Sequence, residues 1–159
     1  MSLYHFTCTL NLPSILKRGY LSAVESNVSG RRPRYGPDVV WLVDTPVLDA
    51  DHGVGRSQME GIRRKAAARG LVLDDDYLAS ADKTRVRIEV DAAGCVRWLE
   101  WPWQSRMTKR WRDGLLSGVG GMEAAEHWWV HEGRITRERW LGIEVDGSPL
   151  DLNTVQWSV

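Results

Sequence analysis

The chain has 159 residues, of which 43% are hydrophobic and 26% charged, a composition that is typical of one folded domain and excludes a largely disordered chain. Lys and Arg together number 21, as do Asp and Glu, so no overall positive field indicates a nucleic-acid partner. No apolar run approaches the roughly 18 residues of a membrane span and no secretory leader is evident, so we expect a cytoplasmic protein with no membrane partner.

The cysteine content argues against a disulfide-stabilised fold and against a zinc site. Only Cys8 and Cys95 are present, which is too few for a disulfide scaffold, and they lack the paired spacing of a zinc site. We therefore expect reduced thiols and no metal centre.

The first part of the chain predicts strand, helix, loop and strand. Residues 3–7 form a short β-like run, and residues 11–19 carry helix punctuation: Asn11 is a good N-cap, and Gly19 suits a left-handed stop. Residues 22–38 are rich in Gly, Pro and Arg, which predicts a long loop. Residues 39–43 are continuously apolar and predict a buried strand that ends at Asp44.

The remainder predicts helices between further strands. We expect helices at residues 56–69 and 102–116 and a strand with one solvent-exposed face at 84–90. The Gly-rich residues 117–121 are expected to interrupt secondary structure. Two strands follow, the first opening at Glu126 and the second covering residues 140–145. Strands that cluster at both ends with helices between them indicate an α+β fold, which we assign to one domain spanning residues 1–159.

Tyr4-His5-Phe6-Thr7 with the following helix, residues 39–44, and Glu126 mark three segments that resemble the motifs of ADP-ribosyltransferase-like enzymes, in particular the DNA-modifying toxins of that superfamily. Residues 4–7 (Tyr-His-Phe-Thr) and the helix opening at 11–16 (Asn-Leu-Pro-Ser-Ile-Leu) resemble the first motif. Residues 39–44 resemble the central strand, although Trp41 stands where many members carry Tyr, and Glu126 stands where the family has its catalytic Glu. The resemblance implies a split β-sheet core with flanking helices.

The resemblance also implies roles for individual residues. His5 and Glu126 are the expected catalytic pair, with NAD as the cofactor, and the expected cofactor or base pocket comprises Tyr4, Thr7, Trp41, Asp44 and Trp128. A carboxylate beside an anomeric carbon stabilises the oxocarbenium character that builds as a base or nicotinamide leaves. Glu123 and Glu132 remain alternatives to Glu126, and His5 has a purely structural alternative.

Two basic and aromatic stretches are candidates for contact with DNA, either single-stranded or with a flipped base. Cations neutralise phosphates and aromatic rings stack on bases. For the second stretch, the alternative is an amphipathic helix whose tryptophans are core and whose cations are solvated. The candidates are Arg31, Arg32 and Arg34 in the long loop, and Trp103, Arg106, Arg110 and Trp111 in the expected helix.

Three functions follow as expectations. The first is transfer of ADP-ribose from NAD to a nucleic-acid base, in a bacterial defence or toxin context. The second is a DNA glycosylase that needs no cofactor and excises a modified base from foreign or phage DNA. The third is a non-catalytic module that binds nucleic acid or protein, for which the replacement Glu126→Gln changes nothing.

Overall fold

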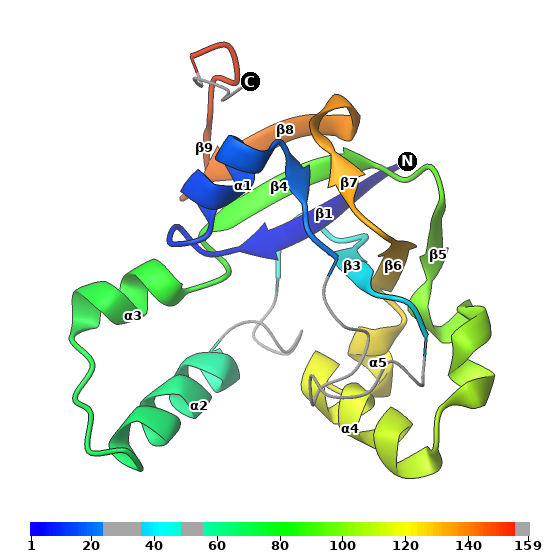
Figure 1. Ribbon diagram of the computed structural model, residues 1–159, viewed down its shortest axis with the longest axis horizontal. Helices are drawn as coiled ribbons and strands as arrows, with labels where there is room; N and C mark the ends of the chain where they lie inside the picture. Colours follow the sequence, from blue (N-terminus) through cyan, green and yellow to red (C-terminus); the bar gives the residue numbers. More distant parts are fainter. Residues whose placement is uncertain (24–35, 49–55, 155–159) are drawn as a thin grey trace.

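An antiparallel sheet forms the centre of the fold, which a computed structural model describes for residues 1–23, 36–48 and 56–154 (Figure 1). In these residues its seven strands lie in the order β5-β6-β3-β1-β4-β8-β9, and every pairing is antiparallel. The strands are β1 (Ser2–Thr7), β3 (Val39–Val43), β4 (Val86–Asp91), β5 (Cys95–Arg97), β6 (Trp128–Glu132), β8 (Trp140–Val145) and β9 (Ser148–Pro149). A separate antiparallel pair joins β2 (Tyr20–Leu21) to β7 (Ile135–Thr136).

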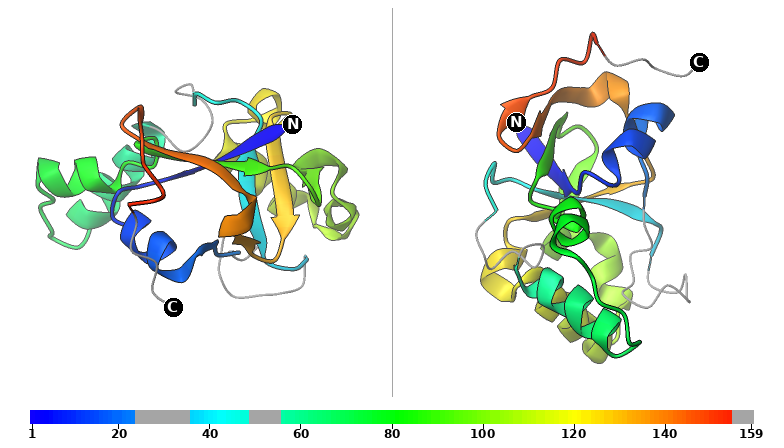
Figure 2. Two further views of the ribbon diagram at one scale, coloured as in Figure 1. Left: turned by 90° about the horizontal axis from the view of Figure 1, so that it is seen from above. Right: turned by 90° about the vertical axis from the view of Figure 1, so that its left-hand side faces the viewer.

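The helices lie outside the sheet in separate groups (Figures 1 and 2). The first, α1 (Leu12–Arg18), lies beside the β2–β7 pair, and α2 (Arg56–Ala67) and α3 (Asp75–Ala81) lie together at one side of the molecule. On the other side are α4 (Lys109–Val119) and α5 (Met122–Ala125), close to β3 and β6. Short 3₁₀-helices are η2 (Trp98–Glu100), η3 (Pro102–Arg106) and η4 (Arg137–Arg139). No helix in the described ranges combines the length and apolar character needed to span a bilayer.

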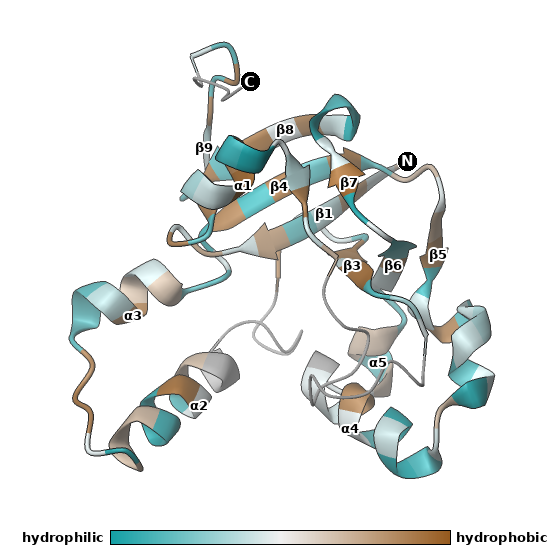
Figure 3. Cartoon of the chain, viewed as in Figure 1, coloured by the Kyte–Doolittle hydropathy of each residue, from teal (hydrophilic) through white to brown (hydrophobic). Residues whose placement is uncertain are grey.

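The sheet separates two hydrophobic cores, because successive side chains of a strand point to opposite faces. Figure 3 shows this as alternating brown and teal along β4. On one face, α1 and the β2–β7 pair cover what we call the α1 core: Leu3, Ile15, Leu21, Val40, Leu42, Val86, Ile88, Val90, Ile135, Trp140 and Ile143. On the other face, η2, α4 and α5 cover the tryptophan core: Val39, Val43, Trp98, Trp101, Met107, Leu115, Ala125, Trp128 and Val130. The structure is a small α+β domain, so the predicted class is confirmed.

Helix α1 ends as predicted but begins differently. Gly19 adopts φ 67°, and its N–H donates to the carbonyls of Ile15 and Leu16. The prediction that the Asn11 side chain caps the helix is wrong, because Asn11 has helical φ −85° and ψ −26° and forms no side-chain cap bond. Its Nδ2 instead donates to Thr7 Oγ1 at 3.2 Å, which ties the start of the helix to β1.

The helix expected over residues 102–116 is in fact two elements, so that prediction is wrong in its start. The 3₁₀-helix η3 ends at Arg106, and the extended, buried Met107 separates it from α4. Thr108 then caps α4, its Oγ1 accepting from Trp111 N at 3.3 Å. A capping threonine requires extended backbone, which explains the break in the middle of an otherwise helical pattern.

Candidate functional site

Two of the predicted site residues, His5 and Thr7, point into the α1 core. They pair with Ile88 and Val86 of β4 and therefore share their face. His5 Nδ1 donates to the Trp41 carbonyl at 3.0 Å, and Thr7, only 3% exposed, accepts from Asn11. Burial lowers the pKa of His5, and the charge of Lys83 adds to this effect while the hydrogen bond to Trp41 opposes it. The ring is therefore held neutral at neutral pH.

Three other predicted pocket residues, Tyr4, Trp41 and Trp128, pack with the tryptophan core on the opposite face. The Trp41 and Trp128 rings meet edge to face with centroids 5.8 Å apart. Tyr4 lies under the guanidinium of Arg87, 5.2 Å from its ring centroid. The five residues expected to hold NAD or a base thus stand on two faces of one sheet, with Thr7 and Asp44 on the face of His5 and these three on the other. They do not form one pocket.

Glu126 does not open a strand, and that prediction is wrong. Helix α5 precedes it, Glu126 keeps helical φ −64° and ψ −24° as the C-cap residue, and β6 begins only at Trp128. Its side chain is exposed in the turn, and its carbonyl accepts from Arg97 Nη1 at 2.7 Å. Of the alternative carboxylates, Glu123 is exposed on α5, whereas Glu132 accepts a hydrogen bond from Trp101 Nε1 at 3.0 Å.

Next to Glu126, the structure assembles a polar group that we call the Asp44 cluster: Asp44, Arg97, His127 and Trp129. Asp44 Oδ1 accepts from His127 Nδ1 at 2.8 Å, and its Oδ2 accepts from Trp129 Nε1 at 3.1 Å. Arg97 Nη2 lies 3.9 Å from Asp44 Oδ2, and its guanidinium lies 4.9 Å from the Trp129 ring centroid. One carboxylate therefore organises an imidazole, an indole and a guanidinium.

Strand register produces the Asp44 cluster. Val43 pairs with Trp128 and Arg97 pairs with Trp129, so the residues after β3 lie beside the residues before β6, and β5 brings Arg97 alongside. A backbone hydrogen bond from Asp44 N to the His127 carbonyl, 3.1 Å long, continues the ladder past both strands. The side chain of Asp44 is 17% exposed and that of His127 is 44% exposed, so the carboxylate is sheltered while the imidazole faces solvent.

His5 shares a face with the Asp44 cluster but does not contact it. Tyr4 pairs with Val43, so His5 lies beside Leu42, which in turn pairs with Trp129. Two strand spacings, about 10 Å, separate His5 from Trp129. Leu42 fills the space between them and is 0% exposed. The expected catalytic pair of His5 and Glu126 is therefore not brought together, and His127 is the histidine nearest to Glu126 along the chain.

The arrangement is suited to proton transfer. A carboxylate oxygen only accepts, so Nδ1 of His127 carries the hydrogen in its contact with Asp44, and Nε2 is the basic nitrogen. This is how a carboxylate orients a histidine that acts as general acid or base. Sequence reasoning missed Arg97 and the contact between Asp44 and His127. The adjacency of His127 to Glu126 was visible in the sequence, but the strand register that joins it to Asp44 was not.

The predicted DNA contacts are placed in part. Trp103 and Trp111 are half-buried against the tryptophan core, whereas Arg106 and Arg110 are exposed. The Arg106 guanidinium covers the Trp103 ring at 4.4 Å from its centroid. Arg31, Arg32 and Arg34 lie outside the described residues. The structure thus gives both tryptophans of this stretch a packing role, as in the amphipathic alternative.

Comparison with family models, with curated proteins and with solved structures gave no match. In the residues that the structure describes, no three His, Cys, Asp or Glu side chains are placed to hold a metal ion.

Proposed function

We propose that the protein is an enzyme that breaks an N-glycosidic bond in nucleic acid or transfers a sugar to one of its bases. The observation that carries the proposal is the contact between Asp44 and His127, 2.8 Å long, at the residue that follows the exposed Glu126 in the chain. Breaking a C1′–N bond needs a negative charge near the sugar and a group that moves a proton, and this corner of the sheet supplies both.

In hydrolysis, the electron pair of the C1′–N bond leaves with the base. A water oxygen then bonds to C1′, and His127 takes the proton that the water loses. Glu126 stabilises the positive charge that develops on the sugar, and Asp44 keeps the imidazole oriented. A half-exposed histidine backed by a sheltered carboxylate supports this form of the reaction, which is that of a DNA glycosylase.

The sequence resemblance supports a second form, in which NAD supplies ADP-ribose and a nucleic-acid base accepts it, on an ADP-ribosyltransferase-like split sheet. In that form, the same Glu126 and His127 act at the sugar and on the proton of the accepting base. The five residues expected for NAD or a base stand on two faces of the sheet, so their arrangement gives this second form no support. Both forms suit a bacterial defence or toxin role.

The test is incubation with single-stranded and duplex DNA, with and without NAD, followed by mass spectrometry of the DNA. Abasic sites and free base support the glycosylase, and a gain of ADP-ribose mass supports the transferase. We expect Glu126→Gln to lower the rate about 100-fold or more and His127→Gln by a similar factor. Glu123→Gln, which removes another exposed charge three residues earlier, on α5, is the matched control and should leave the rate unchanged.

An unmodified DNA product under all these conditions would argue against the enzyme and for the binding module. Loss of the rate in Glu123→Gln, with Glu126→Gln still active, would transfer the sugar-facing role to Glu123.

A further inference from the structure

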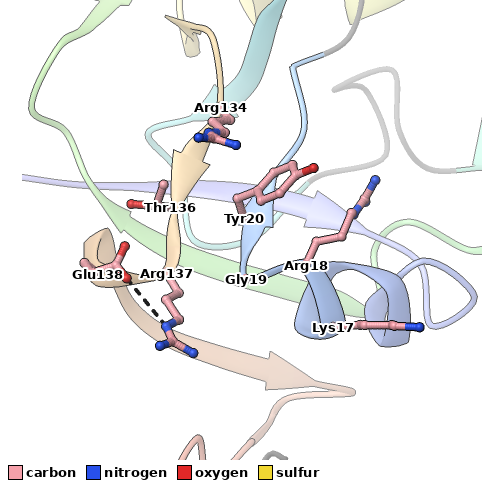
Figure 4. A pocket seen from close by; sticks show the side chains of 8 residues that line it. All are labelled: Lys17, Arg18, Gly19, Tyr20, Arg134, Thr136, Arg137 and Glu138. Carbon is pink, nitrogen blue, oxygen red and sulfur yellow. Dashed lines mark ion pairs between the residues drawn. The ribbon is translucent and has the colours of Figure 1, made fainter. Parts of the chain in front are cut away.

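A basic pocket lies between the C-terminal end of α1 and the β2–β7 pair (Figure 4). Its volume is about 340 Å³, and it opens to solvent. Tyr20 pairs with Thr136 on the outer side of the β2–β7 pair, while their neighbours Leu21 and Ile135 are buried in the α1 core. The pocket is therefore on the outside of the layer that covers the sheet.

The charges in this pocket are unbalanced. Four of its side chains are cationic, Lys17, Arg18, Arg134 and Arg137, against one carboxylate, Glu138, which leaves a net charge of +3 by difference in a chain whose total is zero. Arg137 Nε lies 3.5 Å from Glu138 Oε1. Within residues 1–23, 36–48 and 56–154, Lys17, Arg18 and Arg134 form no ion pair.

Two of these cations are arranged around an aromatic ring. The guanidinium carbons of Arg18 and Arg134 lie 5.5 and 5.2 Å from the Tyr20 ring centroid. Figure 4 shows Tyr20 between them. Contact with the ring fixes the direction of flexible side chains, so their donors are partly preorganised for an anion.

Stabilisation of α1 explains the presence of only two of the four cations in the pocket. Lys17 and Arg18 suit the negative end of the helix dipole. Arg134 and Arg137 come from the chain around β7, and their approach adds repulsion between like charges. An anion bound among the four would turn this repulsion into attraction.

We propose that the basic pocket binds the backbone of single-stranded nucleic acid, with one nucleotide unit seated against Tyr20. Arginine forks match phosphate oxygens, and tyrosine rings and guanidinium planes stack on bases. The pocket is open to solvent, so a strand can reach its cationic side chains. The inference rests on the proposed function for the kind of substrate, and it adds a docking site on the same side of the sheet as the Asp44 cluster.

The test is fluorescence anisotropy with a labelled single-stranded oligonucleotide of about 12 nucleotides, titrated at several salt concentrations. We expect Arg134→Gln to weaken binding several-fold and Arg18→Gln with Arg134→Gln to weaken it about 10-fold or more. The slope of log K against log salt should fall by about 0.7 for each phosphate that the variant no longer neutralises. Arg64→Gln with Arg69→Gln, which removes two exposed cations at and after α2, is the charge-matched control and should bind as the wild type does.

Equal affinity of the Arg134→Gln protein and the wild type would overturn the inference, as would equal weakening by the α2 control. A mononucleotide that bound the pocket as tightly as the oligonucleotide does would show that the pocket does not select a nucleic-acid strand. Arg134 precedes β7 and is exposed, so Arg134→Gln alone decides the matter if the Arg18 change unfolds α1. Glu126→Gln should bind normally, and a wild type that binds the oligonucleotide but leaves DNA unmodified would count against the proposed function and not against this pocket.

Discussion

At the scale of single residues, Asp44 connects the candidate site to the stability of the sheet. It accepts from both His127 and Trp129, and hydrogen bonds to a charged acceptor contribute about 1.5–3 kcal/mol each. A carboxylate with only 17% of its side chain exposed has few water molecules to replace these donors. The residue that orients the His127 imidazole is thus also one on which the start of β6 depends.

A double-mutant cycle tests this link. We expect Trp129→Phe, which removes the indole N–H, to lower the free energy of unfolding by about 1 kcal/mol, and Asp44→Asn by more. In the Asp44→Asn background, the same Trp129→Phe change should cost less, with a coupling of about 0.5–1.5 kcal/mol. Urea denaturation of the four proteins measures the coupling. Strictly additive losses would show that the contact contributes nothing to stability.

His5 makes the stability of the fold depend on pH in a predictable direction. Its unfolded-state pKa is about 6.5, and burial lowers the folded-state pKa. Between the two values the unfolded chain binds more protons, so this contribution to stability is fully present above about pH 6.5 and is lost as the pH falls through the folded-state pKa. His131 behaves in the same way, because burial also lowers its pKa, with Arg139 adding to the effect and a backbone hydrogen bond opposing it.

We therefore expect the wild type to lose stability as the pH falls below about 6.5, and His5→Gln to flatten that dependence. Urea midpoints measured between about pH 7.5 and 5 give the slope for each protein. The ion pair of Arg85 with Asp146 serves as the internal comparison. The hydrogen bond from Arg85 lowers the pKa of Asp146, so the contribution of this ion pair to stability is lost only below about pH 4. An unchanged slope in His5→Gln would mean that the ring is not held neutral by its surroundings.

At the scale of elements, sequence patterns predicted the segments that have a clear period or clear end signals. The apolar run of β3, the strand and helix of residues 2–18, and the alternation in β4 all appear in the structure. The two-residue strands β2 and β7 did not emerge, because two residues define no period. Glu126 was assigned to the start of a strand because the resemblance places a catalytic Glu there, whereas the turn of helix in α5 precedes the strand.

The candidate site was less predictable than the fold. Asp44 and Glu126 were named from the sequence, and both lie at the same end of β3 and β6. The partnership of Asp44 with His127 and Arg97 depends on the pairing of β3, β6 and β5, which no local pattern specifies. Tyr4 and Trp41 were grouped with His5 although strand alternation separates them by face.

Two glycines in different conformations test the assignment of the helix ends. Gly19 has φ 67°, where a Cβ costs about 1–2 kcal/mol, so we expect Gly19→Ala to destabilise the protein by that amount. Gly114 lies inside α4, and a Cβ built there meets nothing within 4 Å. Gly114→Ala should therefore stabilise the protein by about 0.5–1 kcal/mol. Thermal melting of both variants measures the direction of each change in stability. A change in the same direction for both would contradict the left-handed C-cap at Gly19.

At the scale of the whole molecule, one sheet serves two cores, and β3 contributes to both. Val40 and Leu42 pack in the α1 core, while Val39 and Val43 pack in the tryptophan core. The same strand ends at Asp44, so the position of the Asp44 cluster depends on packing on both faces. The basic pocket lies outside the α1 core and relies on the same layer, since Leu21 and Ile135 anchor the strands that flank it.

This shared strand predicts one cooperative unfolding transition. Tryptophan fluorescence reports mainly on the tryptophan core, which holds Trp98, Trp101 and Trp128, whereas far-UV circular dichroism reports on the whole sheet. Leu42→Ala removes a fully buried side chain from the opposite face and should cost about 2–5 kcal/mol. Because loss of Leu42 weakens β3 for both cores, we expect the fluorescence and dichroism midpoints in urea to coincide and to shift together. A shift in dichroism with an unchanged fluorescence midpoint would show that the two cores unfold separately.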